Sequence, residues 1–217
     1  MITRHPSPNF GPRRDGQTPE LIVLHYTEMA SAEAALQRLC DPATEVSAHY
    51  LIARDGRLWQ LVDEPARAWH AGAGEWLGRG DVNSRSIGIE LDNDGHSPFS
   101  APLMAALEAL LPAIMARWSI PARGVIAHSD LAPARKTDPG PRFDWQRLGR
   151  MGLALWPTEP GDPQVPLAAS LDRIGYPRVD PTVRLSAFRL RFRPGISGPE
   201  TAQDRALADA VARMSDD

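Results

Sequence analysis

Three short apolar runs constrain the fold of this chain more than any other feature of its sequence. They have the length of buried β-strands and cover residues 20–25, 86–91 and 124–128. The first and third runs end in His25 and His128, and the second carries Glu90 near its end. Because functional sites collect at strand ends in sheets of this kind, these three side chains are the first candidates for function.

The segments around these runs are predicted to be helices. They have the composition and spacing of amphipathic helices and cover residues 31–39, 102–118 and 142–152. Ser31 is placed to cap the first helix, and Pro112 should kink the second or end its first half. Residues 47–62 are predicted to form a β-hairpin around an Asp55-Gly56 turn. Strands that alternate with long helices indicate an α/β domain, with a central sheet flanked by helices.

Both ends of the chain differ from this alternating pattern. Residues 1–18 are rich in Pro, Gly, Arg and Asn, which favours an extended arm laid over the surface. Residues 157–166 are acidic and proline-rich, and we interpret them as a linker after a catalytic domain of residues 1–156. Residues 167–217 then contain three amphipathic segments and are predicted to form a small three-helix domain.

Charge and composition exclude several classes of protein. The net charge is -3, with basic and acidic residues interspersed, so the chain lacks the basic patch of a nucleic-acid-binding protein. We find no run of about 18 apolar residues that would suggest a membrane span. The first ten residues lack the apolar core of a signal peptide, so we expect a cytoplasmic protein, with a periplasmic location as the alternative. Cys40 is the sole cysteine and is expected to be a reduced core thiol.

The polar residues at the strand ends fit the chemistry of a hydrolytic zinc site. Such a site needs three protein ligands and one open position, and His25, His128 and Asp138 supply two imidazoles and a carboxylate. Glu90 is suited to be the general base, since buried carboxylates are rare unless they are paired or functional. Lys136 is the only lysine of the chain, which suggests that a compact ammonium is required at that position.

Six motifs, in this order, resemble the zinc-dependent N-acetylmuramoyl-L-alanine amidases, a family that includes phage T7-type lysozymes and peptidoglycan recognition proteins. The resemblance covers residues 19–156 and rests on I-V-L-H-Y-T, S-A-H-Y-L-I-A-R-D-G, A-W-H-A-G, N-S-R-S-I-G-I-E-L-D-N, A-H-S-D and K-T-D-P-G. It implies a mixed sheet flanked by helices, with zinc in a surface groove. It also implies that His25, His128 and Asp138 hold the zinc and that Glu90 and Lys136 form the catalytic pair.

Two positions differ from the phage and animal branches of that family. Those branches carry a tyrosine where this chain has Ala48, and usually a cysteine where it has Asp138. The combination found here resembles the bacterial recycling and envelope amidases, and it leaves the base role to Glu90. Because side chains alternate along a strand, we expect Tyr50 to share the face of Ala48 and to reach the groove, while His49 points to the opposite face and packs.

The resemblance further implies a substrate and a groove. The expected reaction is hydrolysis of the amide between the lactyl group of N-acetylmuramic acid, in its anhydro form, and the L-alanine of the stem peptide. The groove wall is expected to contain Trp69, His70, Asn83 and Arg85. Arg85 could pair with a stem-peptide carboxylate or could be a solvated surface residue.

In the C-terminal segment, residues 186–194 read S-A-F-R-L-R-F-R-P and stand between L-D-R-I-G-Y and a closing helix. This stretch is similar to the three-helix peptidoglycan-binding domains of some envelope amidases. Phe188 and Phe192 lie one helical turn apart and are more typical of a helical core than of a glycan platform. Three functions follow: a cytoplasmic enzyme that recycles soluble anhydro-muropeptides, an envelope amidase that acts on polymeric peptidoglycan, and a non-catalytic sensor of peptidoglycan. The sequence favours an enzyme over a sensor, because no ligand or catalytic position is missing. It favours the recycling role over the envelope role, because we find no signal peptide, lipid-attachment cysteine or membrane anchor in it.

Overall fold

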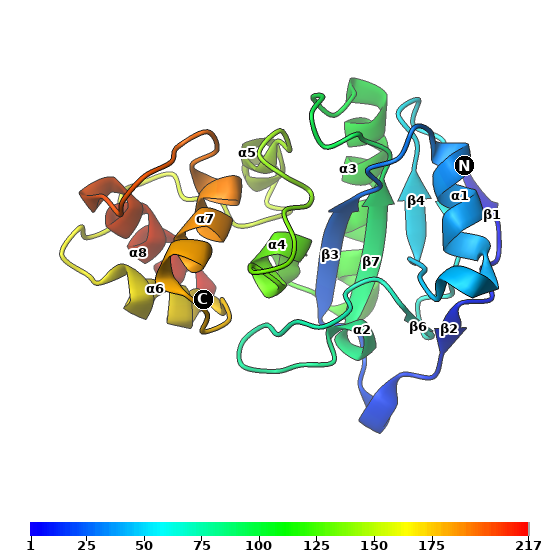
Figure 1. The fold of residues 1–217 in the computed structure, drawn as a ribbon, viewed down its shortest axis with the longest axis horizontal. Helices are drawn as coiled ribbons and strands as arrows, with labels where there is room; N and C mark the ends of the chain where they lie inside the picture. Colours follow the sequence, from blue (N-terminus) through cyan, green and yellow to red (C-terminus); the bar gives the residue numbers. More distant parts are fainter. Residues whose placement is uncertain (217) are drawn as a thin grey trace.

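The computed structural model describes residues 1–216 and has a mixed six-stranded sheet at its centre (Figure 1). From one edge to the other, the strands are β1 (Ile2–Arg4), β5 (Leu58–Gln60), β4 (Tyr50–Ile52), β7 (Ser86–Leu91), β3 (Leu21–Tyr26) and β8 (Val125–Ala127). Only the β4–β5 hairpin is antiparallel within this sheet, and its Gly56 has the positive φ of 87° that the predicted turn requires. A second, two-stranded sheet pairs β2 (Phe10–Gly11) with β6 (Arg67–Ala68).

Helices cover the sheet and extend beyond one of its edges. In chain order they are α1 (Ala32–Cys40), α2 (Val82–Arg85), α3 (Ala101–Trp118), α4 (His128–Leu131), α5 (Trp145–Arg150), α6 (Leu167–Ile174), α7 (Pro181–Phe192) and α8 (Ala202–Asp216). The α/β fold is therefore confirmed, and Ser31 caps α1 as predicted, because its side chain accepts a hydrogen bond from the backbone of Ala34. Cys40 ends α1 as a half-buried free thiol.

Alternation along β3 and β7 decides which side chains face the site. The two strands are parallel, and their register places His25 opposite Glu90. Ile22 and Leu24 of β3 join Ile87 and other residues of β7 in the core beneath α3. His25 and Glu90 therefore lie on the other face, at the carboxyl end of both strands.

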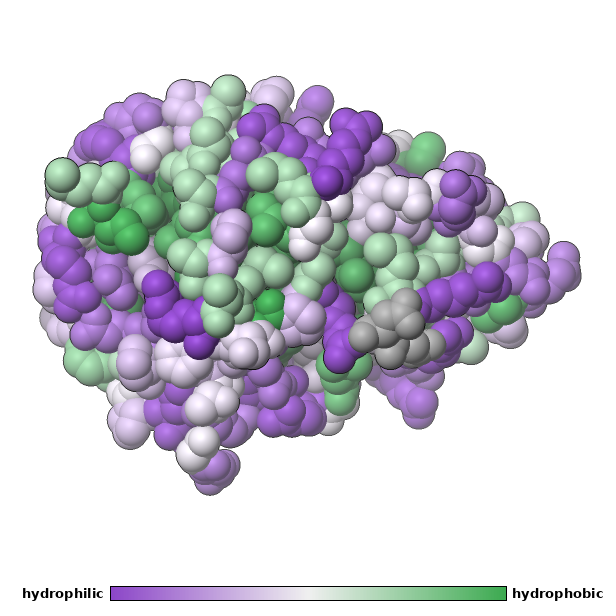
Figure 2. Space-filling model, turned by 180° about the vertical axis from the view of Figure 1, so that it is seen from behind, coloured by the Kyte–Doolittle hydropathy of each residue, from purple (hydrophilic) through white to green (hydrophobic). Residues whose placement is uncertain are grey.

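Helix α3 corrects two expectations. It runs unbroken from Ala101 to Trp118 with Pro112 inside it, so the proline does not end its first half. By length and composition it could also cross a membrane, with a mean hydropathy of 1.2. In this fold it is a core helix, because six of its side chains are buried against the sheet, and its other side lies on the rear surface, where Figure 2 shows apolar residues gathered.

The two ends of the chain are more closely joined to the sheet than the sequence indicated. Strand β1 extends the sheet at one edge by pairing with β5, so the N-terminal segment is extended but is not merely laid over the surface. At the other edge, Val23 and Ile126 of the sheet share one buried cluster with Leu171, Phe188 and Val211 of α6, α7 and α8. The C-terminal helices thus form the three predicted segments and share a core with the sheet; the boundary at residues 157–166 stays a prediction.

Candidate active site

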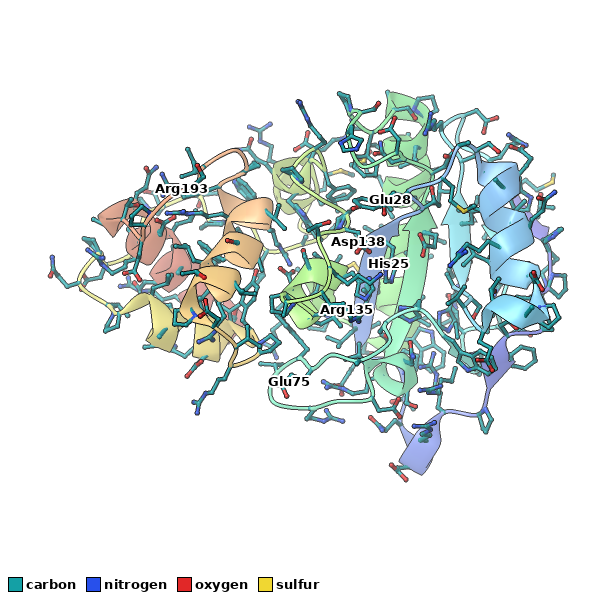
Figure 3. The ribbon with its side chains drawn as sticks, in the orientation of Figure 1. His25, Glu28, Glu75, Arg135, Asp138 and Arg193 are labelled. Atoms are coloured by element: carbon teal, nitrogen blue, oxygen red, sulfur yellow. The ribbon has the colours of Figure 1, made fainter. Side chains whose placement is uncertain are left out.

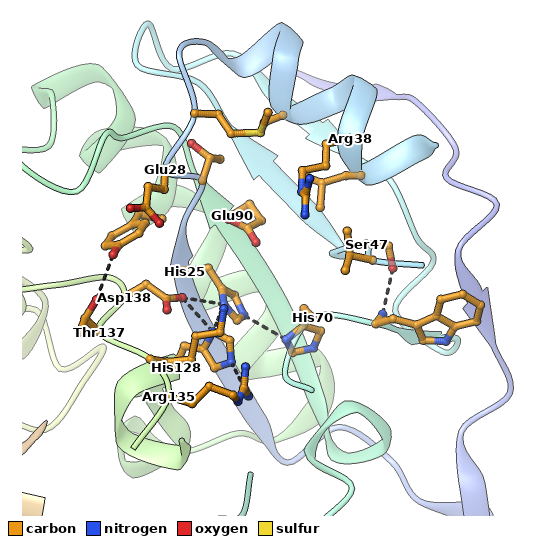
Figure 4. Close-up of a pocket in the computed structure, with 18 residues that line it drawn as sticks. His25, Glu28, Arg38, Ser47, His70, Glu90, His128, Arg135, Thr137 and Asp138 are labelled. Carbon is orange, nitrogen blue, oxygen red and sulfur yellow. Dashed lines mark hydrogen bonds and ion pairs between the residues drawn. The ribbon is translucent and has the colours of Figure 1, made fainter. Parts of the chain in front are cut away.

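Three side chains converge where β3, β8 and the loop after α4 meet (Figure 4). The Nδ1 atoms of His25 and His128 are 3.0 Å apart, and the Oδ2 atom of Asp138 lies 3.0 Å from the first and 2.9 Å from the second. All three residues are buried. Zinc with N and O ligands at about 2.0–2.1 Å separates neighbouring ligand atoms by about 3.3 Å, so this triangle is slightly tighter than a zinc site and is compatible with one.

A backbone carbonyl fixes the tautomer of His128. Its Nε2 atom lies 2.9 Å from the carbonyl oxygen of Ala71. A carbonyl can only accept, so Nε2 carries the proton and Nδ1 keeps its lone pair for a metal. The position of His128 follows from the chain, since β8 ends at Ala127 and α4 begins at the histidine.

A longer chain of hydrogen bonds fixes the tautomer of His25. Ser86 donates its hydroxyl proton to the carbonyl of Val82 at 2.6 Å, so at 3.1 Å its oxygen accepts the Nε2 proton of His70. The Nδ1 atom of His70 is then an acceptor, and it receives the Nε2 proton of His25 at 3.0 Å. The Nδ1 atom of His25 is left with a free lone pair that points at Asp138.

Burial keeps both of these imidazoles neutral. Burial, and next the His128 imidazole, lower the pKa of His25 to about 4, and burial lowers the pKa of His70 well below its ordinary value. The space for His70 comes from Gly88, because a Cβ atom at that position would lie 2.4 Å from the His70 ring. The glycine in the middle of β7 is thus explained by packing, because a larger side chain would overlap with His70.

Glu90 stands beside the triangle as an unpaired acid. Its Oε2 atom is buried and has no hydrogen-bond partner among residues 1–216. Burial, and next the Asp138 carboxylate, raise the pKa of Glu90 well above its ordinary value. A carboxyl group with a raised pKa and an open oxygen can accept and return a proton near neutral pH.

These residues line a pocket of about 530 Å³. Lys136 lines it together with Arg135, whose guanidinium donates to the carbonyls of Ala71 and Ala73 at 2.8 and 2.6 Å. Figure 3 shows His25, Asp138 and Arg135 together in the middle of the molecule, between the sheet and the C-terminal helices. Trp69 and His70, both expected in the groove wall, also line the pocket.

Tyr50 does not lie in this pocket. The expected alternation holds, but the face assigned to the site was the wrong one: Tyr50 pairs with Ile89 and shares the core beneath α3. Its hydroxyl donates to Glu64 at 2.7 Å. His49 is buried on the other face, where its Nδ1 accepts a hydrogen bond from Gly88, so it packs as expected and is not in the ligand group.

Asn83 and Arg85 also lie outside the residues that line the pocket. Asn83 accepts hydrogen bonds from the backbone N–H groups of His70 and Ala71 and so shapes the loop behind the site. Arg85 is 1% exposed and is paired with Glu20. Arg85 is therefore neither a solvated surface residue nor a partner for the substrate, because its guanidinium is used inside the fold.

Sequence reasoning missed several residues of the pocket. They include Tyr26, Glu28, Arg38 and Thr137, and the hydroxyls of Tyr26 and Thr137 lie 3.0 Å apart. Tyr26 and Glu28 follow His25 directly, so their position after the strand was the available signal. Arg38 lies on α1, and nothing in the local pattern distinguished it from other exposed arginines.

Comparison with known proteins agrees with this geometry. Residues 15–141 match the family described as N-acetylmuramoyl-L-alanine amidase. The chain is 36% identical to the N-acetylmuramoyl-L-alanine amidase AmiD of Escherichia coli, over 88% of this chain and 82% of that protein. It is 37% identical to the 1,6-anhydro-N-acetylmuramyl-L-alanine amidase AmpD of the same organism, over 67% of this chain and 88% of that one.

Solved structures give the same result. The fold is similar to that of E. coli AmiD in complex with anhydro-N-acetylmuramic acid-L-Ala-D-gamma-Glu-L-Lys, with a TM-score of 0.81 and 34% identity over 93% of this chain and 91% of the other. It is also similar to Pseudomonas aeruginosa AMPDH3 in complex with an anhydromuramic pentapeptide, with a TM-score of 0.81 and 28% identity over 93% and 94%. From the sequence match and the shared fold, this chain belongs to the N-acetylmuramoyl-L-alanine amidase family.

Proposed function

We propose that this amidase holds a zinc ion through His25, His128 and Asp138 and hydrolyses the amide between the lactyl group of anhydro-N-acetylmuramic acid and L-alanine. The observation that carries the proposal is the ligand triangle, in which hydrogen bonds leave a free Nδ1 lone pair on each imidazole. Two relatives are solved with anhydro-muramyl peptides, which supports the same substrate class here. When bound, the zinc supplies a Lewis acid and lowers the pKa of a water molecule toward neutrality.

The remaining roles belong to side chains of this chain. Glu90 accepts the proton of the attacking water on its open carboxyl oxygen and then donates it to the leaving nitrogen of L-alanine. Lys136 donates to the carbonyl oxygen, where negative charge develops as the water adds to the carbon. His70 and Ala71 hold the two imidazoles in place from behind.

Zinc content and amide cleavage, measured on the same preparation, test this proposal. We expect one zinc per chain, release of the stem peptide from an anhydro-muramyl tripeptide, and loss of that activity on chelation. His128→Ala should lose both the metal and the activity. Stoichiometric zinc in the His128→Ala protein, or full activity in excess chelator, would show that the ligand set is wrong.

We further propose that the substrates are soluble anhydro-muropeptides of cell-wall recycling in the cytoplasm, rather than the polymeric wall. The bound ligands of the two relatives, which are both anhydro-muramyl peptides, support the choice of substrate. The test compares rates on soluble anhydro-muropeptides and on intact sacculi, together with fractionation of cells that express the native gene. Efficient digestion of sacculi and recovery outside the cytoplasm would instead identify an envelope enzyme.

A further inference from the structure

The carboxylate of Asp130 joins the metal site to the C-terminal helices. Asp130 is fully buried in α4, two residues after His128. Its Oδ2 atom accepts the backbone N–H of Ala127 at 2.9 Å and the guanidinium of Arg191 at 2.9 Å. Its Oδ1 atom accepts the hydroxyl of Tyr176 at 2.6 Å. Three donors therefore hold one carboxylate, and two of them come from the segment that contains α6 and α7.

Both of these donors are themselves held in place. The guanidinium of Arg191 lies over the ring of Trp145, 4.1 Å from its centroid, and the side chain is 5% exposed. Tyr176 is 3% exposed and packs edge-on against Trp76. Burial, and next the Asp130 charge, raise the pKa of Tyr176 well above its ordinary value, so its hydroxyl remains a donor.

The segment that these contacts hold is too short to keep its own orientation. Helix α4 has four residues, a single turn, and an isolated turn of helix is not stable in water. Two metal ligands depend on it: His128 is its first residue, and the backbone N–H of Ser129 donates to the carbonyl of Asp138 at 3.0 Å. Any rotation of α4 therefore changes two edges of the ligand triangle together.

We infer that Arg191 and Tyr176 are positioning residues for the metal site, acting through Asp130 on α4. The inference rests on the proposed function, because the property that it concerns is the affinity of the site for zinc. Outer partners of metal ligands typically contribute 10- to 100-fold to metal affinity. Since Arg191 acts one contact further away, its loss should weaken zinc binding about tenfold, near the lower limit of that range.

The same helix offers a matched control. Arg189, two residues before Arg191 on α7, is equally buried and also pairs with a buried aspartate, at 2.6 Å. Its partner is Asp204 of α8, whose carboxylate accepts hydrogen bonds from Arg189, Arg193 and Thr201 rather than from α4. Arg189→Met thus removes a comparable buried ion pair of the same helix, α7, without touching the link to the metal ligands.

The experiment compares the zinc affinity and the thermal stability of the full-length wild type, Arg191→Met, Arg191→Lys, Tyr176→Phe and Arg189→Met. Competition with a chromogenic chelator gives the affinity, and cobalt in place of zinc gives absorption bands that report the ligand geometry. We expect zinc affinity to fall about tenfold in Arg191→Met and severalfold in Tyr176→Phe, with Arg191→Lys in between. The cobalt bands should shift in the same variants, while Arg189→Met should lose stability only.

Each alternative result has a separate meaning. Wild-type affinity and cobalt bands in both Arg191→Met and Tyr176→Phe would overturn the inference. So would an equal loss of affinity in Arg189→Met, because affinity would then only follow stability. If Arg191→Met does not fold, the result for Tyr176→Phe decides the test, because this variant removes only a single hydroxyl. A wild type that binds no zinc would refute the proposed function instead, which is a distinguishable failure.

Discussion

Two buried groups of charged residues in this molecule are built in opposite ways. At the active site, three ligand atoms crowd within 3.0 Å of one another, and Glu90 keeps a buried oxygen without a partner. Among the C-terminal helices, the carboxylate of Asp204 is satisfied on both oxygens by Arg189, Arg193 and Thr201. The active-site group leaves polar atoms free to bind a ligand, at a cost in stability. The Asp204 group uses both carboxylate oxygens in hydrogen bonds that hold helices together.

The largest test of this contrast is Glu90→Gln. We expect turnover to fall by about 10³- to 10⁴-fold, because the amide cannot accept the proton of the attacking water. Zinc content should be unchanged, and the free energy of unfolding should stay equal or rise, since a buried unpaired carboxyl group is removed. Steady-state kinetics, metal analysis and urea unfolding measure the three quantities. Near-normal turnover would show that Glu90 is not the base, and a clear loss of stability would show that its carboxyl group stabilises the fold.

The converse test is Asp204→Ala. Removal of this carboxylate leaves the buried Arg189 uncompensated and also removes the hydrogen bonds that its Oδ2 atom accepts from the backbone N–H and the hydroxyl of Thr201, so the free energy of unfolding should fall by about 3–5 kcal/mol. Under conditions where the variant is folded, its zinc affinity and turnover should match the wild type. A variant that keeps its stability but loses zinc would show that the helix cluster serves the site directly.

The smallest test concerns His49, which is buried behind the site without being a ligand. Burial, and next Arg13, lower its pKa to about 3, so in the folded state it stays neutral as the pH falls. The unfolded chain takes up that proton below about pH 6.5, so the stability contributed is complete above this pH and is lost as the pH falls toward 3. Between about pH 8 and pH 5, this histidine alone should account for about 2 kcal/mol of lost stability.

His49→Gln makes that contribution measurable. Glutamine retains an acceptor for the N–H of Gly88 but cannot titrate, so unfolding curves of the variant should depend less steeply on pH than those of the wild type. An unchanged slope in His49→Gln would mean that this imidazole does not resist protonation in the folded protein.

The group that we propose as metal ligands could be predicted from the sequence because two of its three members lie at the ends of recognisable strands. His25 and His128 follow apolar runs whose ends must meet at one edge of a parallel sheet, and Asp138 lies in a short loop ten residues after His128. Tyr50 shows the limit of that argument. Alternation establishes that Tyr50 and His49 face opposite ways, but it does not say which face carries the site, and the pairing of β4 with β7 decides that.

The hydrogen bonds behind the ligands could not be predicted by any local pattern. His70 supports His25 only because Ser86 and Val82 orient it and Gly88 leaves room for its ring. Likewise, Asp130 and Arg191 are 61 positions apart and are adjacent only in the folded chain. Contacts of this kind depend on tertiary packing, which a sequence without a structure does not specify.

The cluster that Val23 and Ile126 share with Leu171 and Phe188 has a consequence for synthesis on the ribosome. Translation delivers the sheet first, and domains generally fold from the N-terminal side as they emerge. Here one apolar face of β3 and β8 stays uncovered until α6 and α7 have been made, and both helices are translated after His25, His128 and Asp138. We therefore expect nascent chains arrested before α7 to need chaperone protection and to hydrolyse no substrate, so that amidase activity begins only when translation of α7 is finished.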